Sequence, residues 1–215
     1  MHLEEGDIIF SKFFNLSEEK QQRILNAALK EFAQKGYKNA STNQIVKDAD
    51  ISKGLLFHYF KNKKQLFLFL YDYCIELSMK EFYKQVNLDE KDFFVKLRQI
   101  QLIKLELLSK YPEILKFIEV ANIEESNDVK NDLEIINKEA IESASRKVFE
   151  DIDVSKFREN VDVKKTINIV MWTFKGFNEK LMEDAKLSPS RQIDYKKAIE
   201  EINVYTKMLK NCFYK

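Results

Sequence analysis

The chain has 215 residues, of which 45% are hydrophobic and 33% are charged, and its formal net charge is +1. This length is ample for a packed core, and the hydrophobic content excludes a disordered chain. Four glycines and two prolines are too few for a many-turned β-sandwich or a βαβ fold, so the composition predicts an all-α fold of long helices.

The N-terminal part of the sequence predicts four helices. Ser17 is a suitable N-cap, and the apolar face of Ile24, Ala28 and Phe32 predicts a helix that ends at Gly36. A short second helix is capped by Ser41 or Thr42. After a tight turn at Asp50-Ile51, a short third helix runs from Ser52 through Phe60. The fourth helix is long: Asn62 caps it, and it runs to about Gln85.

The rest of the chain predicts a helical bundle. Residues 92–110 are apolar nearly all round, which is typical of a helix buried in the middle of a bundle. Further helices are predicted over 113–123, from Ser126 or Asn127 onward, over 162–183, and over 189–213 with Ser188 and Pro189 as N-cap and first residue. The last two repeat apolar residues four and three apart. They therefore predict an α-hairpin that completes the core or pairs with a second copy.

Basic residues concentrate at the N-terminal side. Residues 12–64 carry eleven basic and five acidic side chains, whereas residues 65–215 carry 25 basic and 27 acidic ones. A basic unit joined to a slightly acidic one suggests a phosphate-facing head on a body with another role. Ordinary solvated surface is the alternative that charge by itself leaves open.

Three features predict a cytoplasmic protein without a membrane partner. The longest apolar run, residues 66–71, is far shorter than the roughly 20 residues that a spanning helix needs. The first seven residues are acidic and lack the basic start of a signal peptide. Cys74 and Cys212 lie far apart in a chain rich in charge, which indicates reduced thiols rather than a disulfide framework.

Three short helices with a tight turn between the second and third match a helix-turn-helix. Residues 41–63 read STNQIVKDADISKGLLFHYFKNK. This segment resembles the DNA-binding head of the TetR family of bacterial transcriptional regulators, whose hallmark is Ser-Lys-Gly, a small residue, Leu, an aromatic, His, Tyr-Phe and then Lys-x-Lys. The resemblance covers roughly residues 17–75 and is most specific over 41–66.

The resemblance implies a two-domain homodimer. Residues 1–62, with a core of 17–62, would form the DNA-binding domain, and residues 63–215 would bind an effector and dimerise. Two heads would then contact a pseudo-palindromic operator in successive major grooves about 34 Å apart. A ligand beside the long fourth helix would tilt it and release the DNA, so the expected function is that of a ligand-responsive repressor.

Physical chemistry agrees with DNA contact by this segment. Thr42 would bind phosphate and Asn43 could reach a base edge, while Gly54 would let the backbone approach the groove. By resemblance, Lys53 and Leu55 face bases. Leu55 stands where Thr is commoner, so it could contact a thymine methyl instead. The expected DNA-binding residues are Ser41, Thr42, Asn43, Ser52, Lys53, Gly54, Leu55, Phe57, His58, Tyr59, Lys61, Lys63 and Lys64.

Lys63 and Lys64 fall in the first turn of the predicted fourth helix, where cations oppose the helix dipole by about 0.3–1 kcal/mol each. That cost is understandable if a phosphate sits at this helix end, drawn by the free N–H groups as well as by the lysines. Simple solvation of both lysines is the alternative.

The resemblance also implies an effector pocket and a dimer interface in the C-terminal part. The pocket would take a small apolar ligand, flat or long, although Arg98 and Gln101 could equally face solvent. The pocket candidates are Tyr71, Phe94, Leu97, Arg98, Gln101, Phe117 and Trp172. The interface candidates are Val170, Phe174, Gly176, Phe177, Leu181, Ile199, Ile202 and Leu209.

Other functions find less support in the sequence. It contains no Gly-rich phosphate loop, nucleophile elbow or spaced metal-ligand set, so we expect neither an enzyme nor a cofactor or metal. Two alternatives remain: the same fold acting as an activator, and a helical small-molecule carrier or enzyme that does not bind DNA.

Overall fold

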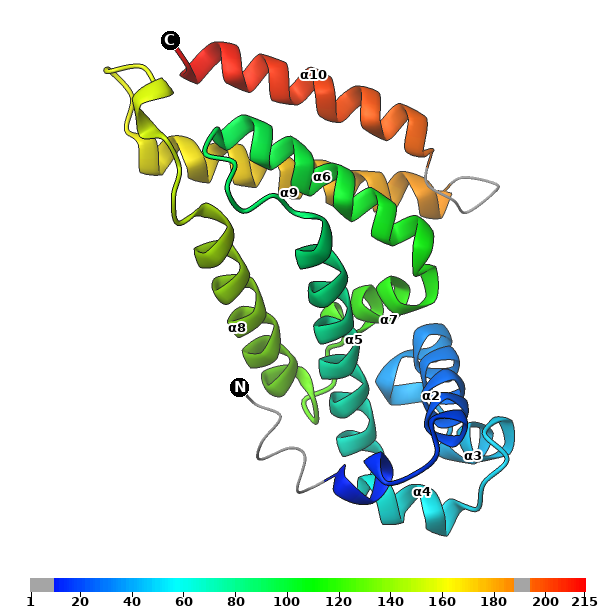
Figure 1. The fold of residues 1–215 in the computed structure, drawn as a ribbon. Helices are drawn as coiled ribbons and strands as arrows, with labels where there is room; N and C mark the ends of the chain where they lie inside the picture. Colours follow the sequence, from blue (N-terminus) through cyan, green and yellow to red (C-terminus); the bar gives the residue numbers. More distant parts are fainter. Residues whose placement is uncertain (1–9, 188–193) are drawn as a thin grey trace. The chain divides into compact units, whose positions relative to one another are not determined.

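The computed structural model describes residues 10–187 and 194–215, and every regular element in those ranges is a helix (Figure 1). This confirms the predicted all-α fold. The elements are α2 (Glu18–Asn39), α3 (Thr42–Asp48), α4 (Lys53–Phe60), α5 (Lys63–Gln85), α6 (Phe93–Lys110), α7 (Pro112–Asn122), α8 (Lys130–Phe149), the 3₁₀ turn η1 (Val154–Lys156), α9 (Val163–Leu187) and α10 (Tyr195–Phe213).

The helices pack as two compact units. The first comprises the described residues up to Tyr83 together with Leu107–Ala144, and the second comprises Lys84–Glu106 and the described residues from Ser145 onward. Most of α5 therefore packs with α2, α3 and α4. The predicted domains, 1–62 for DNA binding and 63–215 for effector binding and dimerisation, were divided by function rather than by packing. That division stays a prediction.

An aromatic core holds the first unit together. The face of α2 that periodicity predicted is buried, with Ile24, Ala28 and Phe32 exposed by 1% or less. Phe32 meets Phe67 of α5 edge-on with ring centroids 4.8 Å apart, and Phe67 meets Phe117 of α7 at 5.3 Å. Edge-to-face pairs of this kind stabilise a core beyond the area that they bury. They fix α2 and α5 against α7.

The end of α2 and the start of the last helix differ from the predictions: α2 runs to Asn39, with non-helical dihedrals at Gly36, where it was expected to end. Ser17 occupies the N-cap position of α2, but its side chain makes no capping hydrogen bond. The last helix begins at Tyr195, because the Asp194 carboxylate accepts the Lys197 N–H at 3.0 Å. The predicted cap at Ser188 and Pro189 lies outside the described residues.

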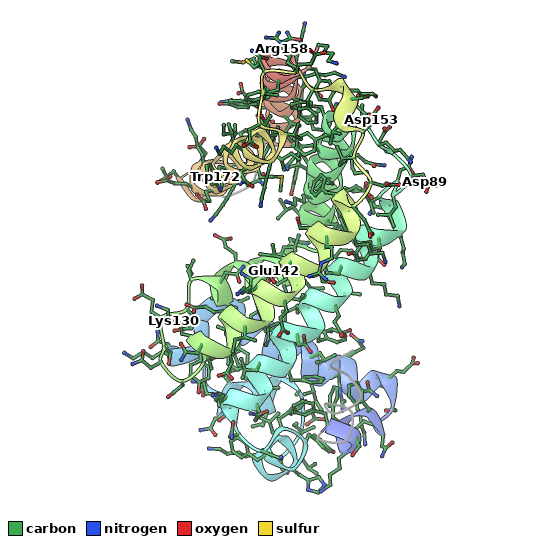
Figure 2. All side chains as sticks on the ribbon, turned by 90° about the vertical axis from the view of Figure 1, so that its left-hand side faces the viewer. Asp89, Lys130, Glu142, Asp153, Arg158 and Trp172 are labelled. Carbon is green, nitrogen blue, oxygen red and sulfur yellow. The ribbon has the colours of Figure 1, made fainter. Side chains whose placement is uncertain are left out.

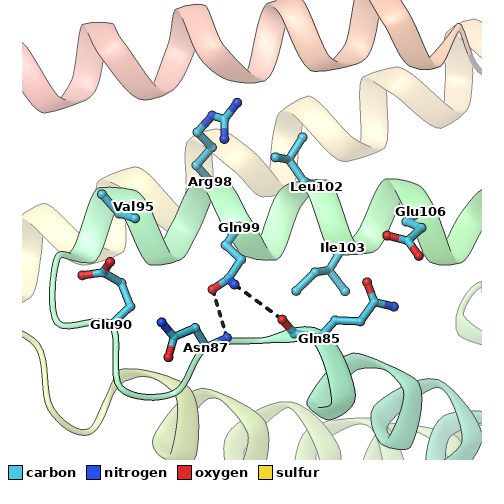
Figure 3. Close-up of a pocket in the computed structure, with 9 residues that line it drawn as sticks. All are labelled: Gln85, Asn87, Glu90, Val95, Arg98, Gln99, Leu102, Ile103 and Glu106. Carbon is cyan, nitrogen blue, oxygen red and sulfur yellow. Dashed lines mark hydrogen bonds between the residues drawn. The ribbon is translucent and has the colours of Figure 1, made fainter.

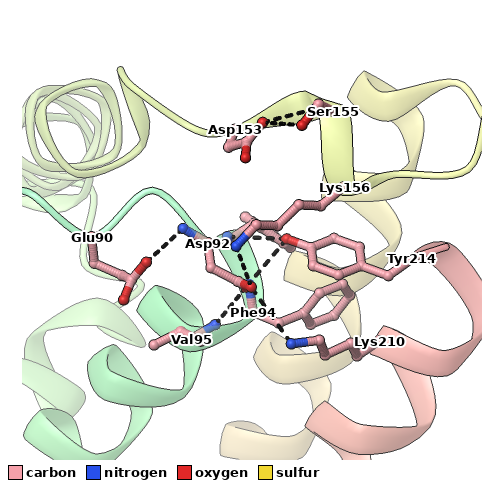
Figure 4. A network of polar contacts seen from close by, with 10 residues as sticks. Glu90, Asp92, Phe94, Val95, Asp153, Ser155, Lys156, Lys210 and Tyr214 are labelled. Atoms are coloured by element: carbon pink, nitrogen blue, oxygen red, sulfur yellow. Dashed lines mark hydrogen bonds and ion pairs between the residues drawn. The ribbon is translucent and has the colours of Figure 1, made fainter.

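In the second unit, Asp92 links the start of α6 to the end of α10 (Figure 4). Its carboxylate accepts the N–H groups of Phe94 and Val95 at 3.0 and 3.1 Å and pairs with Lys156 at 3.1 Å. Burial by itself would raise the pKa of Asp92, but the Val95 amide and the Lys156 ammonium outweigh burial and hold that pKa below its usual value. The remaining partners are Lys210 at 3.5 Å and the Tyr214 hydroxyl at 3.3 Å.

We expect the Asp92→Asn substitution to lower the free energy of unfolding at neutral pH by about 1–3 kcal/mol, because a buried charged partner is lost. Since the folded pKa lies below the unfolded one, the ionised carboxylate stabilises the fold at neutral pH. This contribution begins to fall as pH drops below the unfolded pKa of about 4 and is lost as pH falls through the lower folded pKa. Urea unfolding at about pH 7 and about pH 3.5 checks this. If the parent chain and the Asp92→Asn variant lost equal free energies of unfolding between these two pH values, the predicted role of the Asp92 carboxylate would be wrong.

The two thiols have opposite surroundings. Cys74 on α5 is 1% exposed, and burial raises the pKa of its thiol to about 12. Cys212 lies near the end of α10 and is exposed. At neutral pH, the Cys74 thiol is therefore protonated and shielded.

Candidate nucleic-acid interface

Local hydrogen bonds build the helix-turn-helix from the sequence. The Ser41 hydroxyl accepts the N–H of Gln44 at the start of α3, and the Ser52 hydroxyl accepts the N–H of Leu55 at 3.2 Å at the start of α4. Between the helices, Asp50 takes a φ of 52°, in the left-handed region that Asp tolerates better than most residues. The predicted caps and turn are confirmed here.

The inner face of this motif is sealed. Ile45, Ala49, Leu56 and Phe60 are each 0% exposed. Phe60 lies against the Phe13 and Phe69 rings, with centroids 5.0 and 5.2 Å away.

The outer face of α4 is open to solvent. Ser52, Lys53, Gly54 and His58 are exposed, and Leu55 is 43% exposed although it is a large apolar side chain. Apart from its chain neighbours and the backbone of α4, a methyl group added at Gly54 would come within 4 Å of one atom of the described residues, the Ser52 hydroxyl oxygen at 3.9 Å. Packing within the chain therefore does not require a glycine at this position.

The remaining predicted DNA-binding residues lie around this face. Asn43 and Lys61 are exposed, while Ser41, Thr42, Phe57 and Tyr59 are half-buried. The Lys53 ammonium lies 5.9 Å from the centre of the Phe57 ring, and Lys61 ends α4 with a φ of 60°.

Lys63 and Lys64 are engaged within the chain. The Lys63 ammonium donates to the Lys38 carbonyl at 3.2 Å and lies 5.0 Å from the Tyr37 ring centre, and its pKa is lowered by burial. The Lys64 ammonium pairs with Asp132 of α8 at 2.8 Å, and this hydrogen bond raises its pKa. Neither ammonium stands free at the start of α5, so a phosphate there would have to share or replace these partners.

Two carboxylates that sequence reasoning did not select support the segment between α2 and α3. Glu31 is 4% exposed and accepts the Ser41 N–H at 2.8 Å and the Lys35 ammonium at 2.9 Å. Glu124 accepts the Tyr37 N–H at 2.7 Å. The sequence offers a signal for Glu31, because it is a charged residue on the apolar face of its helix. It offers none for Glu124, whose partner Tyr37 is 87 residues away in the chain.

Comparisons with known proteins agree with this geometry. Residues 24–70 match the sequence profile of the bacterial regulatory proteins of the tetR family. The match covers the helix-turn-helix and parts of the helices on either side of it, about a fifth of the chain, and this head therefore resembles the TetR family.

Curated relatives match about a third of this chain. YuxN of Bacillus subtilis, described as an uncharacterized HTH-type transcriptional regulator, is 40% identical over 73 residues, which are 34% of this chain and 24% of that protein. HbdR of Aromatoleum sp., an HTH-type transcriptional regulator, is 30% identical over 72 residues, which are 34% of this chain and 31% of that protein. The matched stretch thus spans less than a third of each relative.

Solved structures share the fold over most of the chain. A TetR family transcriptional regulator from Chloroflexus aurantiacus has a TM-score of 0.65 at 21% identity and covers 95% of this chain and 98% of its own. FadR of Bacillus subtilis, solved in complex with stearoyl-CoA, has a TM-score of 0.65 at 16% identity and covers 87% of this chain and 96% of its own. At these identities the likeness shows the fold alone.

The predicted effector residues belong to both units of the chain. Tyr71 and Phe117 are buried together in the first unit, with ring centroids 6.5 Å apart. Phe94, Leu97 and Gln101 are buried in the second unit, and Trp172 is 68% exposed (Figure 2).

Arg98 is the predicted effector residue that lines an open groove (Figure 3). This groove has a volume of about 530 Å³ and holds no other member of the predicted set. The Arg98 guanidinium donates to Asn203 at 2.6 Å. The groove is lined by Gln85, Asn87, Glu90, Val95, Arg98, Gln99, Leu102, Ile103 and Glu106.

Three of the predicted dimer residues are buried within this single chain. Val170, Phe174 and Ile202 are at most 1% exposed within this single chain, so they offer no surface to a second copy. Their heptad-like spacing marks the inner face of the α9–α10 hairpin. Gly176 is exposed with no atom within 4 Å of an added methyl, and Phe177, Leu181, Ile199 and Leu209 are half-buried or exposed. The exposed large apolar side chains on α9 and α10 include Ile169, Trp172, Leu187, Ile199, Val204 and Met208.

The described residues show two further absences. Over 10–187 and 194–215, no helix is both long and apolar enough to cross a bilayer. In the same ranges, no three His, Cys, Asp or Glu side chains gather in a way that could hold a metal ion.

Proposed function

We propose that this chain is a DNA-binding transcriptional repressor that acts as a homodimer on a pseudo-palindromic operator and is released by a small apolar effector. The observation that carries the proposal is the solvent-facing edge of α4, where Lys53, Gly54 and Leu55 are exposed beside a sealed inner face. Gly54 is exposed, and no neighbouring side chain in the described residues requires a glycine there. A glycine at such a position allows the helix backbone to approach a DNA groove closely.

In this proposal α4 enters the major groove and α3 supports it. Lys53 and Leu55 would read base edges, and Asn43 at the start of α3 would reach a neighbouring base. Thr42 and His58 would bind phosphates, which fix the register of the protein on the duplex.

Dimer formation would join two such heads. The exposed apolar side chains Ile169, Trp172, Val204 and Met208 on α9 and α10 are the surface that we assign to the second copy. Exposed large apolar side chains on neighbouring helices are typical of an interface between protein chains. The open space at Gly176 would admit a partner helix.

An effector would bind in the second unit. The side-chain oxygen of Gln101 is buried and has no hydrogen-bond partner among the described residues, so a ligand donor could satisfy it. Activation instead of repression depends on where the operator lies relative to a promoter.

The Gly54→Ala substitution separates DNA contact from folding. The variant is expected to fold at least as well as the parent, because the added methyl meets open space and alanine favours a helix over glycine. Its affinity for a duplex selected from random DNA by the parent chain should fall about tenfold or more, because the backbone can no longer approach the groove as closely. Fluorescence anisotropy with the selected duplex measures this, and the same titration with stearoyl-CoA present tests release by a ligand that carries a long apolar chain.

Lys116→Ala is the matched control, since Lys116 is exposed on α7 outside the motif. Its affinity should stay close to that of the parent. A parent chain that selects no sequence from random DNA would refute the proposed function, and a Gly54→Ala variant with unchanged affinity would remove α4 from the groove.

A further inference from the structure

Glu124 lies just beyond the end of α7 and holds the segment that precedes the helix-turn-helix. One carboxylate oxygen accepts the Tyr37 N–H at 2.7 Å, and the other accepts the Ser126 N–H at 3.1 Å. Tyr37 directly follows Gly36, whose φ of 67° and ψ of −178° are not helical although α2 continues to Asn39. A methyl group at Gly36 would lie 3.1 Å from the Glu124 carboxylate, so the carboxylate is seated directly against the backbone.

The segment that Glu124 holds leads directly to α3. On its other side the Lys63 ammonium of α5 binds the Lys38 carbonyl, and the Tyr37 ring meets Phe67 edge-on with centroids 5.2 Å apart. The segment ends at Ser41, whose N–H is held by Glu31 and whose hydroxyl caps α3. Residues 37–41 are therefore fixed at both ends, and Glu124 supplies the contact that comes from α7.

We propose that Glu124 is a positioning residue for DNA binding, which sets the start of α3 relative to α7 through the Tyr37 N–H. This inference rests on the proposed function. Glu124 does not touch DNA in this account. A charge-assisted hydrogen bond to a backbone amide beside a kink in the helix restricts the segment more than a neutral contact would. Any displacement of the end of α7 would pass through the same carboxylate to the helix-turn-helix.

The test compares variants of Glu124 in the full-length chain, with affinity for the selected duplex measured over a range of salt concentrations. Glu124→Ala is expected to weaken binding about tenfold, the effect of one charge-assisted hydrogen bond, without changing the salt slope, because no phosphate contact is lost. Glu124→Gln keeps an acceptor oxygen and should retain most of the affinity. Glu125→Ala removes the neighbouring exposed carboxylate and should bind like the parent.

Two further measurements keep the inference falsifiable. Glu124→Asp keeps the charge but withdraws it by one methylene, so it should weaken binding even if the alanine variant does not fold. Amide hydrogen exchange without DNA should be faster over residues 37–41 in the Ala or Asp variant than in the parent. Folded variants with parental affinity, or with unchanged exchange over that segment, would overturn the inference. Failure of the parent to bind any duplex would instead refute the proposed function, while the exchange result still stands.

Discussion

Replacing Phe60 with alanine is expected to destabilise the first unit by about 3–5 kcal/mol, the cost of deleting a fully buried aromatic side chain. Phe60 is 0% exposed and closes α4, with rings of Phe10, Phe13 and Phe69 between 5.0 and 5.9 Å from its own. Such a loss is a large fraction of the stability of a typical domain, so DNA binding should disappear with it. Urea unfolding followed by circular dichroism measures the change.

Phe57→Ala on the same helix is the control. Its ring is half-buried, and the ring contact found for it within residues 10–187 and 194–215 is the Lys53 ammonium at 5.9 Å. The cost of Phe57→Ala should therefore be well below that of Phe60→Ala. Similar unfolding midpoints for the two variants would show that the α4 core is not organised around Phe60.

The Trp172→Arg substitution should separate the proposed dimer. Trp172 is 68% exposed in the single chain, and buried tryptophans are frequent hot spots that contribute about 2–4 kcal/mol to an interface. An arginine there would bring two like charges together across a two-fold axis. Dimer affinity should fall at least about 30-fold, and operator affinity should fall with it because the two heads are no longer linked.

Sedimentation velocity over a range of concentrations measures the dimer equilibrium. Ile141→Arg provides the matched control, because Ile141 is 59% exposed on α8, outside the α9–α10 hairpin. It should leave the dimer intact. The interface assignment fails if the parent chain sediments as a monomer throughout, or if the Trp172 variant associates as strongly as the parent.

Features set by neighbouring residues could be predicted from the sequence. Ser41, Ser52 and Asn62 cap their helices because each side chain reaches an N–H three residues further along the chain. The glycine at position 36 also has a local explanation, because its φ of 67° lies in the left-handed region that glycine adopts readily.

Features that join distant segments could not be predicted in this way. The hydrogen bond from Tyr37 to Glu124 spans 87 residues, and the pair of Lys64 with Asp132 joins α5 to α8. Both depend on how helices pack, which spacing does not reveal. The hairpin of α9 and α10 shows the same limit, because periodicity marks an apolar face without telling whether it meets its own chain or a second one.

Cys74 is buried and Cys212 is exposed, so the two thiols should differ in their reactivity toward a labelling reagent. A maleimide dye at neutral pH should modify Cys212 and leave the shielded Cys74 untouched, so the natural chain carries a site for a single fluorophore at the end of α10. Energy transfer between donor- and acceptor-labelled copies would then report subunit exchange without any engineered residue.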